Sequence, residues 1–113
     1  MHELSLTQSL VEIAAEHAQR AGATAIRSIT LEVGDLSGVL PEALEFAFDV
    51  CRTGTMAAAS TLNIRRVAGR GHCTACAADA VVTQLTAVCP ACGALTFELV
   101  AGLELRVLEL EID

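Results

Sequence analysis

Two stretches of the chain carry apolar residues at helical spacing. The first runs from residue 5 to residue 21 and predicts an amphipathic helix, with Ser5 and Gln8 as a capping box at its start and Gly22 after its end. Its predicted apolar face consists of Leu6, Leu10, Ile13 and Ala14. The second stretch, Pro41 to Arg52, begins with a proline, which suits the first turn of a helix.

Three other segments are typical of strands. Residues 26–33 and 61–67 alternate between apolar and polar side chains. Residues 103–112 also alternate, but the phase changes within the segment, which indicates a bulge or a change in burial. Two helices and three strands predict an α+β fold in which two helices cover a small three-stranded sheet.

Composition and charge exclude several classes of protein. The chain has 113 residues, 53% of them hydrophobic, and a formal net charge of -7. That hydrophobicity is too high for a disordered chain, and the acidic balance disfavours binding to nucleic-acid backbones or anionic membrane surfaces. No apolar run is long enough to span a bilayer, and the amino-terminal residues lack the pattern of an export signal. We therefore expect a soluble cytoplasmic protein without nucleic-acid or membrane partners.

The spacing of the cysteines predicts a metal site. Four of the five cysteines form the pattern C-x2-C-x12-C-x2-C, at Cys73, Cys76, Cys89 and Cys92. In a chain without an export signal, two such pairs favour tetrahedral zinc over disulfides. Gly93 follows the second pair, where the turn needs a positive φ angle, whereas Ala77 occupies the equivalent position after the first pair. We expect a closed, structural zinc site.

The remaining cysteine and the neighbouring histidine are open to more than one interpretation. Cys51 continues the apolar stripe of the second predicted helix, so a buried thiol is the expected role and a reactive or metal-binding thiol the alternative. His72 precedes Cys73 and is either an exposed residue, a hydrogen-bond donor to the metal site or an alternative ligand.

Glycines flank the cysteine segment. Residues 69–71 and 101–102 are predicted to be flexible joints, so the chain should divide into a body of residues 1–68 plus 101–113 and an inserted zinc-ribbon-like lobe of residues 69–100. A lobe of about 30 residues is too small to fold by apolar burial alone. Its folding should therefore depend on the metal.

The start of the chain offers a second set of metal ligands. The Met1 amine, the His2 backbone amide and the His2 imidazole can close fused chelate rings around an ion such as Ni2+ or Cu2+, which favours square-planar nitrogen donors. Glu3 can add its amide nitrogen or its carboxylate. A surface histidine without a metal is the alternative. No catalytic sequence motif occurs, so we do not expect an enzyme.

Several segments together resemble the HypA/HybF family of nickel-incorporation proteins, which mature [NiFe] hydrogenases. The resemblance lies in Met1–Ser5, Leu31–Val39, Pro41–Phe48, the paired CxxC units and Glu104–Val107, in collinear order over nearly the whole chain. Departures are small: Asp35 stands where glutamate is usual, and Ala77 replaces the commoner glycine or polar residue.

The resemblance implies a nickel metallochaperone without catalytic turnover. His2 with the adjacent backbone, and Glu3 where it contributes, would bind Ni2+, while Cys73, Cys76, Cys89 and Cys92 would hold structural zinc. The implied partners are the GTPase HypB and the precursor of the hydrogenase large subunit, and some members also serve urease. A homodimer is also compatible with the sequence.

Two alternatives belong to other functional classes. A zinc-ribbon module that binds proteins or nucleic acid would need a basic face, yet the segment from Arg70 to Glu98 contains one Arg, one Asp and one Glu. A CxxC redox enzyme would undergo reversible thiol oxidation and would hold no tightly bound zinc.

Overall fold

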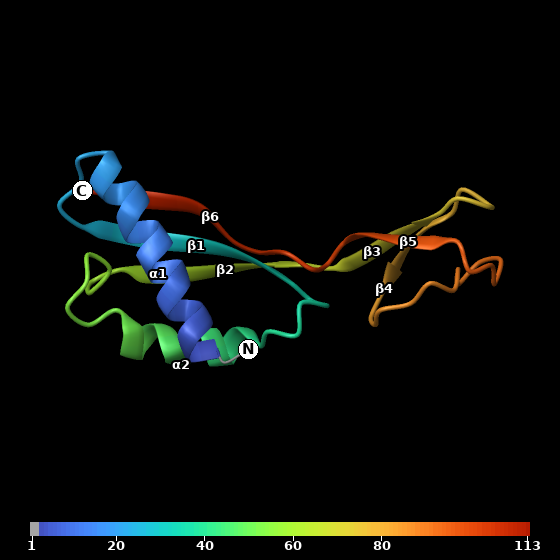
Figure 1. The fold of residues 1–113 in the computed structure, drawn as a ribbon, viewed down its shortest axis with the longest axis horizontal. Helices are drawn as coiled ribbons and strands as arrows, with labels where there is room; N and C mark the ends of the chain where they lie inside the picture. The colour runs from blue at the N-terminus through green and yellow to red at the C-terminus, as the bar shows by residue number, and fades with distance from the viewer. Residues whose placement is uncertain (1–2) are drawn as a thin grey trace. The chain divides into compact units, whose positions relative to one another are not determined.

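The computed structural model describes residues 3–113, so Met1 and His2 lie outside the described residues. Within residues 3–113, two helices and six strands follow one another (Figure 1). Their bounds are α1 (Glu3–Arg20), β1 (Ile26–Gly34), α2 (Pro41–Cys51), β2 (Thr61–Val67), β3 (Gly69–Cys73), β4 (Asp79–Val82), β5 (Phe97–Ala101) and β6 (Leu105–Ile112). None of the helices in residues 3–113 has the length and apolar character needed to cross a bilayer.

The chain forms two compact units. Unit 1 comprises the chain up to Glu32, Val39–Arg65 and Arg106–Asp113, and unit 2 comprises Val33–Gly38 and Arg66–Leu105. One three-stranded sheet has the order β2-β1-β6 and the other has the order β4-β3-β5. The predicted α+β fold, with two helices and a small three-stranded sheet, is confirmed.

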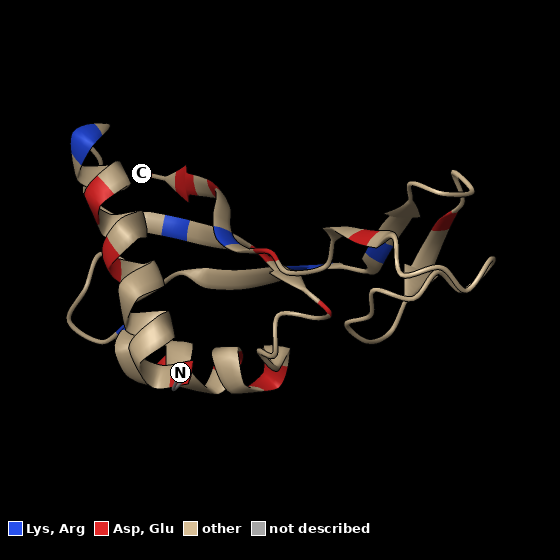
Figure 2. Ribbon diagram, turned by 45° about the vertical axis from the view of Figure 1, so that its right-hand side comes forward, with Lys and Arg blue, Asp and Glu red and all other residues tan. Residues whose placement is uncertain are grey.

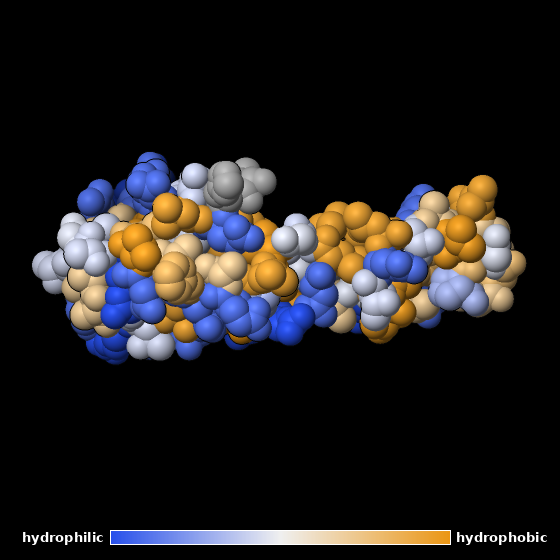
Figure 3. All heavy atoms as spheres, turned by 90° about the horizontal axis from the view of Figure 1, so that it is seen from below, coloured by the Kyte–Doolittle hydropathy of each residue, from blue (hydrophilic) through white to orange (hydrophobic). Residues whose placement is uncertain are grey.

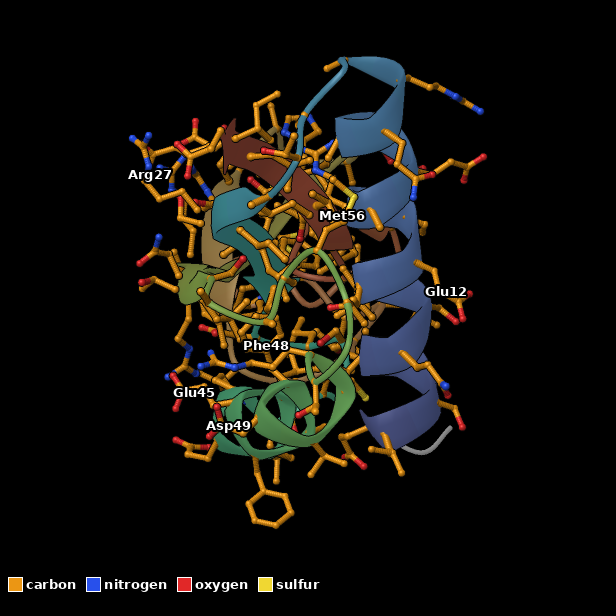
Figure 4. The ribbon with its side chains drawn as sticks, turned by 90° about the vertical axis from the view of Figure 1, so that its left-hand side faces the viewer. Glu12, Arg27, Glu45, Phe48, Asp49 and Met56 are labelled. Atoms are coloured by element: carbon orange, nitrogen blue, oxygen red, sulfur yellow. The ribbon has the colours of Figure 1, made fainter. Side chains whose placement is uncertain are left out.

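The core of unit 1 lies between the helices and β1. Leu10 and Val11 of α1, Phe48 of α2 and Ile29 and Leu31 of β1 surround one small apolar cavity. In Figure 4, Phe48 points into the interior, whereas Glu12 points outward from α1. The apolar side chains of the two helices and the strand thus share a single core.

The predicted apolar face of α1 is only partly correct. Leu10 and Ala14 are buried, but Ile13 is 43% exposed. The buried stripe continues instead through Ala18, a side chain small enough for close packing of the helix. Because α1 carries apolar residues on more than one side, its sequence could not show which stripe the rest of the fold covers.

Of the predictions for the two ends of α1, the one for the start is wrong and the one for the end is correct. The capping-box prediction for Ser5 and Gln8 is wrong, because α1 begins at Glu3 and the Ser5 carbonyl already accepts a hydrogen bond from the Ser9 hydroxyl at 3.1 Å. The predicted end at Gly22 is confirmed: its φ is +77°, and its N–H donates to the Gln19 carbonyl at 3.0 Å. A left-handed glycine closes the helix in this way.

The glycines before the cysteine segment are part of a strand, so the predicted flexible joint at residues 69–71 is wrong. Gly69 and Gly71 are buried in β3, which pairs with β4 and β5. A Cβ atom on Gly71 would lie 2.1 Å from the Phe97 ring. Glycine is required there by the close approach of an aromatic ring and not by flexibility.

Candidate metal centre

Two turns with the same backbone geometry hold the four cysteines of unit 2. The Ala77 N–H donates to the Cys73 carbonyl, and the Gly93 N–H donates to the Cys89 carbonyl, each at 2.9 Å. Ala77 and Gly93 have φ angles of +61° and +78°. The left-handed position predicted from the sequence is therefore present in both turns, and in the first an alanine occupies it.

The four thiol sulfurs converge on one point. All four Sγ atoms lie within 4.8 Å of one another, with Cys73 and Cys89 buried and Cys76 and Cys92 exposed. The Cys73–Cys92 and Cys76–Cys89 sulfur pairs are each separated by 3.7 Å, and none of the four forms a disulfide. Zn–S bonds of about 2.3 Å in a tetrahedron place sulfurs about 3.8 Å apart. The spacing of the thiols therefore suits zinc.

Backbone N–H groups surround the buried sulfurs. The Cys76 N–H donates to Cys73 Sγ at 3.5 Å. The N–H groups of Ala91 and Cys92 donate to Cys89 Sγ at 3.3 and 3.4 Å. Because these donors favour the anionic form of sulfur, the turns are built for thiolates, which are the form that binds metal.

The protonation of the two buried cysteines shows the same preference. The Thr96 hydroxyl lies 3.2 Å from Cys73 Sγ. This hydroxyl, followed by the Cys76 N–H, lowers the pKa of Cys73 to about 6. The pKa of Cys89 is also lowered, first of all by the Cys92 N–H. Two of the four candidate ligands therefore favour the thiolate form before any metal binds.

Cys76 behaves differently because it shares the site with other anionic sulfurs. The Ala78 N–H acts to lower its pKa, but the sulfurs of Cys73, Cys92 and Cys89, together with desolvation, outweigh that donor and raise the pKa to about 12. Four negative charges this close are unfavourable without a compensating cation. A divalent ion would supply that compensation and displace the remaining protons.

The two turns provide a matched test of backbone strain. We expect Ala77→Gly to stabilise metal-loaded unit 2 by about 1 kcal/mol, because alanine is strained at a left-handed φ and glycine is not. Gly93→Ala should destabilise it by a similar amount for the same reason. Zinc competition with a chelator, measured for both variants, checks the pair. Shifts of the same sign in the two variants would contradict the assignment.

The hydroxyl beside Cys73 gives a pH prediction. Thr96→Val removes the largest of the contributions that lower the Cys73 pKa, so this pKa should rise. A larger share of the Cys73 thiol then keeps its proton at a given pH, and zinc must displace that proton to bind. The pH of half-maximal zinc release should therefore move upward. A chromogenic zinc indicator followed across a pH series measures this shift. Thr83→Val, at an exposed threonine of the same unit, should leave the release curve unchanged.

The other candidate residues lie apart from the four sulfurs. Met1 and His2 are outside the described residues, and Glu3 is the first residue of α1. His72 Nδ1 lies 2.8 Å from the Asp79 carboxylate across the β3–β4 pair. Alternation along β3 directs His72 and Cys73 to opposite faces, which favours the interpretation of His72 as a residue outside the metal site.

Cys51 is also separate from the cluster. Its thiol is half-buried, and its sulfur lies 3.7 Å from the Leu4 carbonyl. The prediction of a buried thiol is therefore only partly correct, because the end of α2 leaves part of Cys51 exposed.

Sequence reasoning missed Thr96. It lies 23 residues after Cys73 and precedes β5, and its hydroxyl reaches the sulfur because the Thr74 N–H donates to the Thr96 carbonyl at 3.2 Å. Threonine has many roles in turns and strands, so nothing in the sequence distinguished this one.

Comparison with known proteins gives a consistent result. Residues 1–112 match the family described as HypA, hydrogenase/urease nickel incorporation, metallochaperone. Hydrogenase maturation factor HypA from Geobacter metallireducens is 48% identical over 113 residues, and its counterpart from Geobacter sulfurreducens is 49% identical over 113 residues. Both matches cover 100% of this chain and 100% of the relative.

Solved structures show the same fold. The solution structure of the Ni metallochaperone HypA from Helicobacter pylori has a TM-score of 0.72 and 26% sequence identity, and the match covers 99% of this chain and 97% of that chain. A second solution structure, of a HypA protein, has a TM-score of 0.75 and covers 100% of this chain.

Proposed function

This chain belongs to the HypA family of nickel metallochaperones for hydrogenase and urease, and we propose that it binds Ni2+ at its amino-terminal residues and helps to insert the ion into the large subunit of [NiFe] hydrogenase. A metallochaperone carries its metal and is not an enzyme. Nickel is therefore the cargo, and zinc is the resident ion.

The observation that carries this proposal is the closure of the four-cysteine cluster. A site with four thiolate ligands leaves no open position on zinc, so it serves structure and not exchange. Within residues 3–113, the cluster is the one group of three or more His, Cys, Asp or Glu side chains close enough to share an ion. This supports a separate nickel site that depends on residues 1 and 2.

The proposed nickel ligands are the Met1 amine, the His2 amide and the His2 imidazole, with the amide or carboxylate of Glu3 as the fourth donor. The position of Glu3 supports this arrangement. As the first residue of α1, Glu3 has an N–H without an intrahelical partner. Nickel can therefore displace that proton without breaking a helical hydrogen bond.

The proposed site is suited to release as well as to binding. Its ligands belong to a chain end, so they can be replaced one at a time by those of an acceptor. The amine, imidazole and amide must all lose protons, so nickel affinity should fall on acidification. We propose that the body of residues 1–68 plus 101–113 carries nickel, while the lobe of residues 69–100 holds zinc and contributes a rigid surface.

The proposed partners follow from the family. They are the GTPase HypB and the precursor of the hydrogenase large subunit. Free thiols at the zinc site need a reducing compartment, which supports action in the cytoplasm.

The metal content of two forms of the chain tests the proposal. The untagged chain should bind one nickel and one zinc, and an amino-terminal extension, which removes the free amine, should greatly weaken nickel binding while zinc stays bound. The untagged nickel form should also pass its nickel to the purified large-subunit precursor, as measured by elemental analysis after separation. Retention of all nickel by the untagged form would contradict a carrier function.

A further inference from the structure

The solvent-facing side of α2 combines apolar and acidic residues in separate rows. Phe46 is 75% exposed and Val50 is 55% exposed, one helical turn apart, and we call these two residues the apolar strip. The acidic row next to it consists of the exposed residues Glu42, Glu45 and Asp49. At 100° per residue the two rows occupy adjacent arcs of the helix.

The apolar strip is not part of the core. The residues of α2 that reach the core are Leu44, Ala47 and Phe48, on the opposite side of the helix. A single exposed apolar side chain is common, but an exposed phenylalanine with an apolar neighbour one turn away is typical of a binding surface. Figure 3, which shows the molecule from below the view of Figure 1, displays apolar patches among hydrophilic side chains over unit 1.

The end of α2, just after the strip, lies close to the start of α1. Val50 precedes Cys51, whose sulfur is 3.7 Å from the Leu4 carbonyl. Leu4 is itself 50% exposed and follows His2 by two positions. The end of α2 therefore lies next to the first turn of α1, which directly follows the residues proposed above to hold nickel.

The acidic row has little compensation from basic residues. Within residues 3–113, Asp49 approaches Arg52 at 3.8 Å, whereas Glu42 and Glu45 form no ion pair. Glu45 and Asp49 project from the side of α2 that faces away from α1 (Figure 4). Figure 2 shows acidic positions on α2. Charge complementarity therefore favours a partner whose Lys or Arg side chains face this acidic row.

We propose that this side of α2 is the docking surface for the nickel-accepting protein. The acceptor would offer an apolar pocket to Phe46, with a rim of Lys or Arg facing Glu42, Glu45 and Asp49. The acceptor is favoured as the occupant because it must reach the nickel ligands, and Leu4, whose carbonyl lies 3.7 Å from the Cys51 sulfur at the end of α2, follows His2 by two positions. This inference rests on the proposed function, in which the acceptor is the hydrogenase large-subunit precursor.

Phe46→Ala tests the surface because the side chain makes little contribution to the core. We expect the variant to bind the purified large-subunit precursor about tenfold or more weakly, as for an aromatic residue at the centre of an interface. Leu95→Ala, at a residue of unit 2 that is 77% exposed, is the matched control and should bind normally. Biolayer interferometry with immobilised precursor measures both affinities, and circular dichroism checks that both variants are folded.

The charges give an independent readout. Combined Glu45→Gln and Asp49→Asn substitutions should slow association with the precursor and reduce its dependence on salt, because the exposed charges steer the encounter. Nickel titration of each variant without the precursor should match that of the wild type.

The remaining outcomes overturn the inference. Unchanged affinity of Phe46→Ala for the precursor overturns it. A variant that is impaired only in self-association, or only in binding to the GTPase HypB, overturns it as well. A wild-type chain that binds nickel but not the precursor overturns the docking surface and leaves nickel binding in place. A wild-type chain that binds neither overturns the proposed function as well.

Discussion

Removal of zinc is expected to unfold residues 69–100 while the core of unit 1 remains folded. The buried cluster of unit 2 consists of Cys73, Cys89 and Phe97, with three small or medium apolar residues packed against it. Two of its three buried members are thus proposed metal ligands. Binding of structural zinc contributes about 10–16 kcal/mol in small domains, which this cluster cannot replace.

The substitution Cys89→Ser removes zinc by removing one of its proposed ligands. Cys89 is 1% exposed and accepts two backbone N–H groups at its sulfur, so its loss removes a ligand and leaves buried donors poorly satisfied. The amide resonances of residues 69–100 in a heteronuclear NMR spectrum should collapse toward random-coil positions. Those of Leu10, Ile29 and Phe48 should stay dispersed, because their core is separate.

Cys51→Ser is the matched control for Cys89→Ser. It changes a cysteine outside the cluster and should retain zinc and all dispersed resonances. A zinc-free Cys89→Ser protein whose residues 69–100 stay folded would show that the metal is not required for the lobe.

Replacement of His2 with alanine is expected to abolish nickel binding and leave zinc bound. His2 is proposed to supply both an imidazole and an amide within fused chelate rings, so the substitution removes one donor and opens one ring. Loss of a residue that only hydrogen-bonds to a metal ligand lowers metal affinity about 10–100-fold. Loss of the ligand itself should therefore lower the nickel affinity by more than about 100-fold. Isothermal titration with nickel measures the loss, and elemental analysis measures the zinc.

The other two histidines provide controls for the His2 substitution. His17 is exposed on α1, and His72 pairs with Asp79 in unit 2. Neither His17→Ala nor His72→Ala should alter nickel affinity. Unchanged nickel affinity in the His2 variant, or a large loss in either control, would place the nickel site elsewhere.

Local patterns in the sequence were reliable where one residue type has one main structural use. The two CxxC pairs predicted the convergence of four sulfurs because short turns bring each pair together. Gly22 and Gly93 were expected at chain turns, and both have positive φ angles. The alternation in residues 26–33 marked β1, whose apolar face is buried.

Predictions failed where the same residue serves different structures. Gly71 was expected in a flexible joint but lies in β3 under the Phe97 ring, a contact between residues 26 positions apart. Ser5 was expected before a helix that begins at Glu3. The Thr96 hydroxyl beside Cys73 depends on pairing between distant segments. Such features depend on tertiary contacts that no single window of sequence contains.

X-ray absorption at the zinc and nickel edges of the fully loaded chain tests the central claim most directly, because it reports the ligands of each metal separately. We expect four sulfur ligands at about 2.3 Å around zinc and only nitrogen or oxygen ligands around nickel. Sulfur ligands around nickel, with zinc lacking its four sulfurs, would contradict the division of the two metals between the cysteine cluster and the amino terminus.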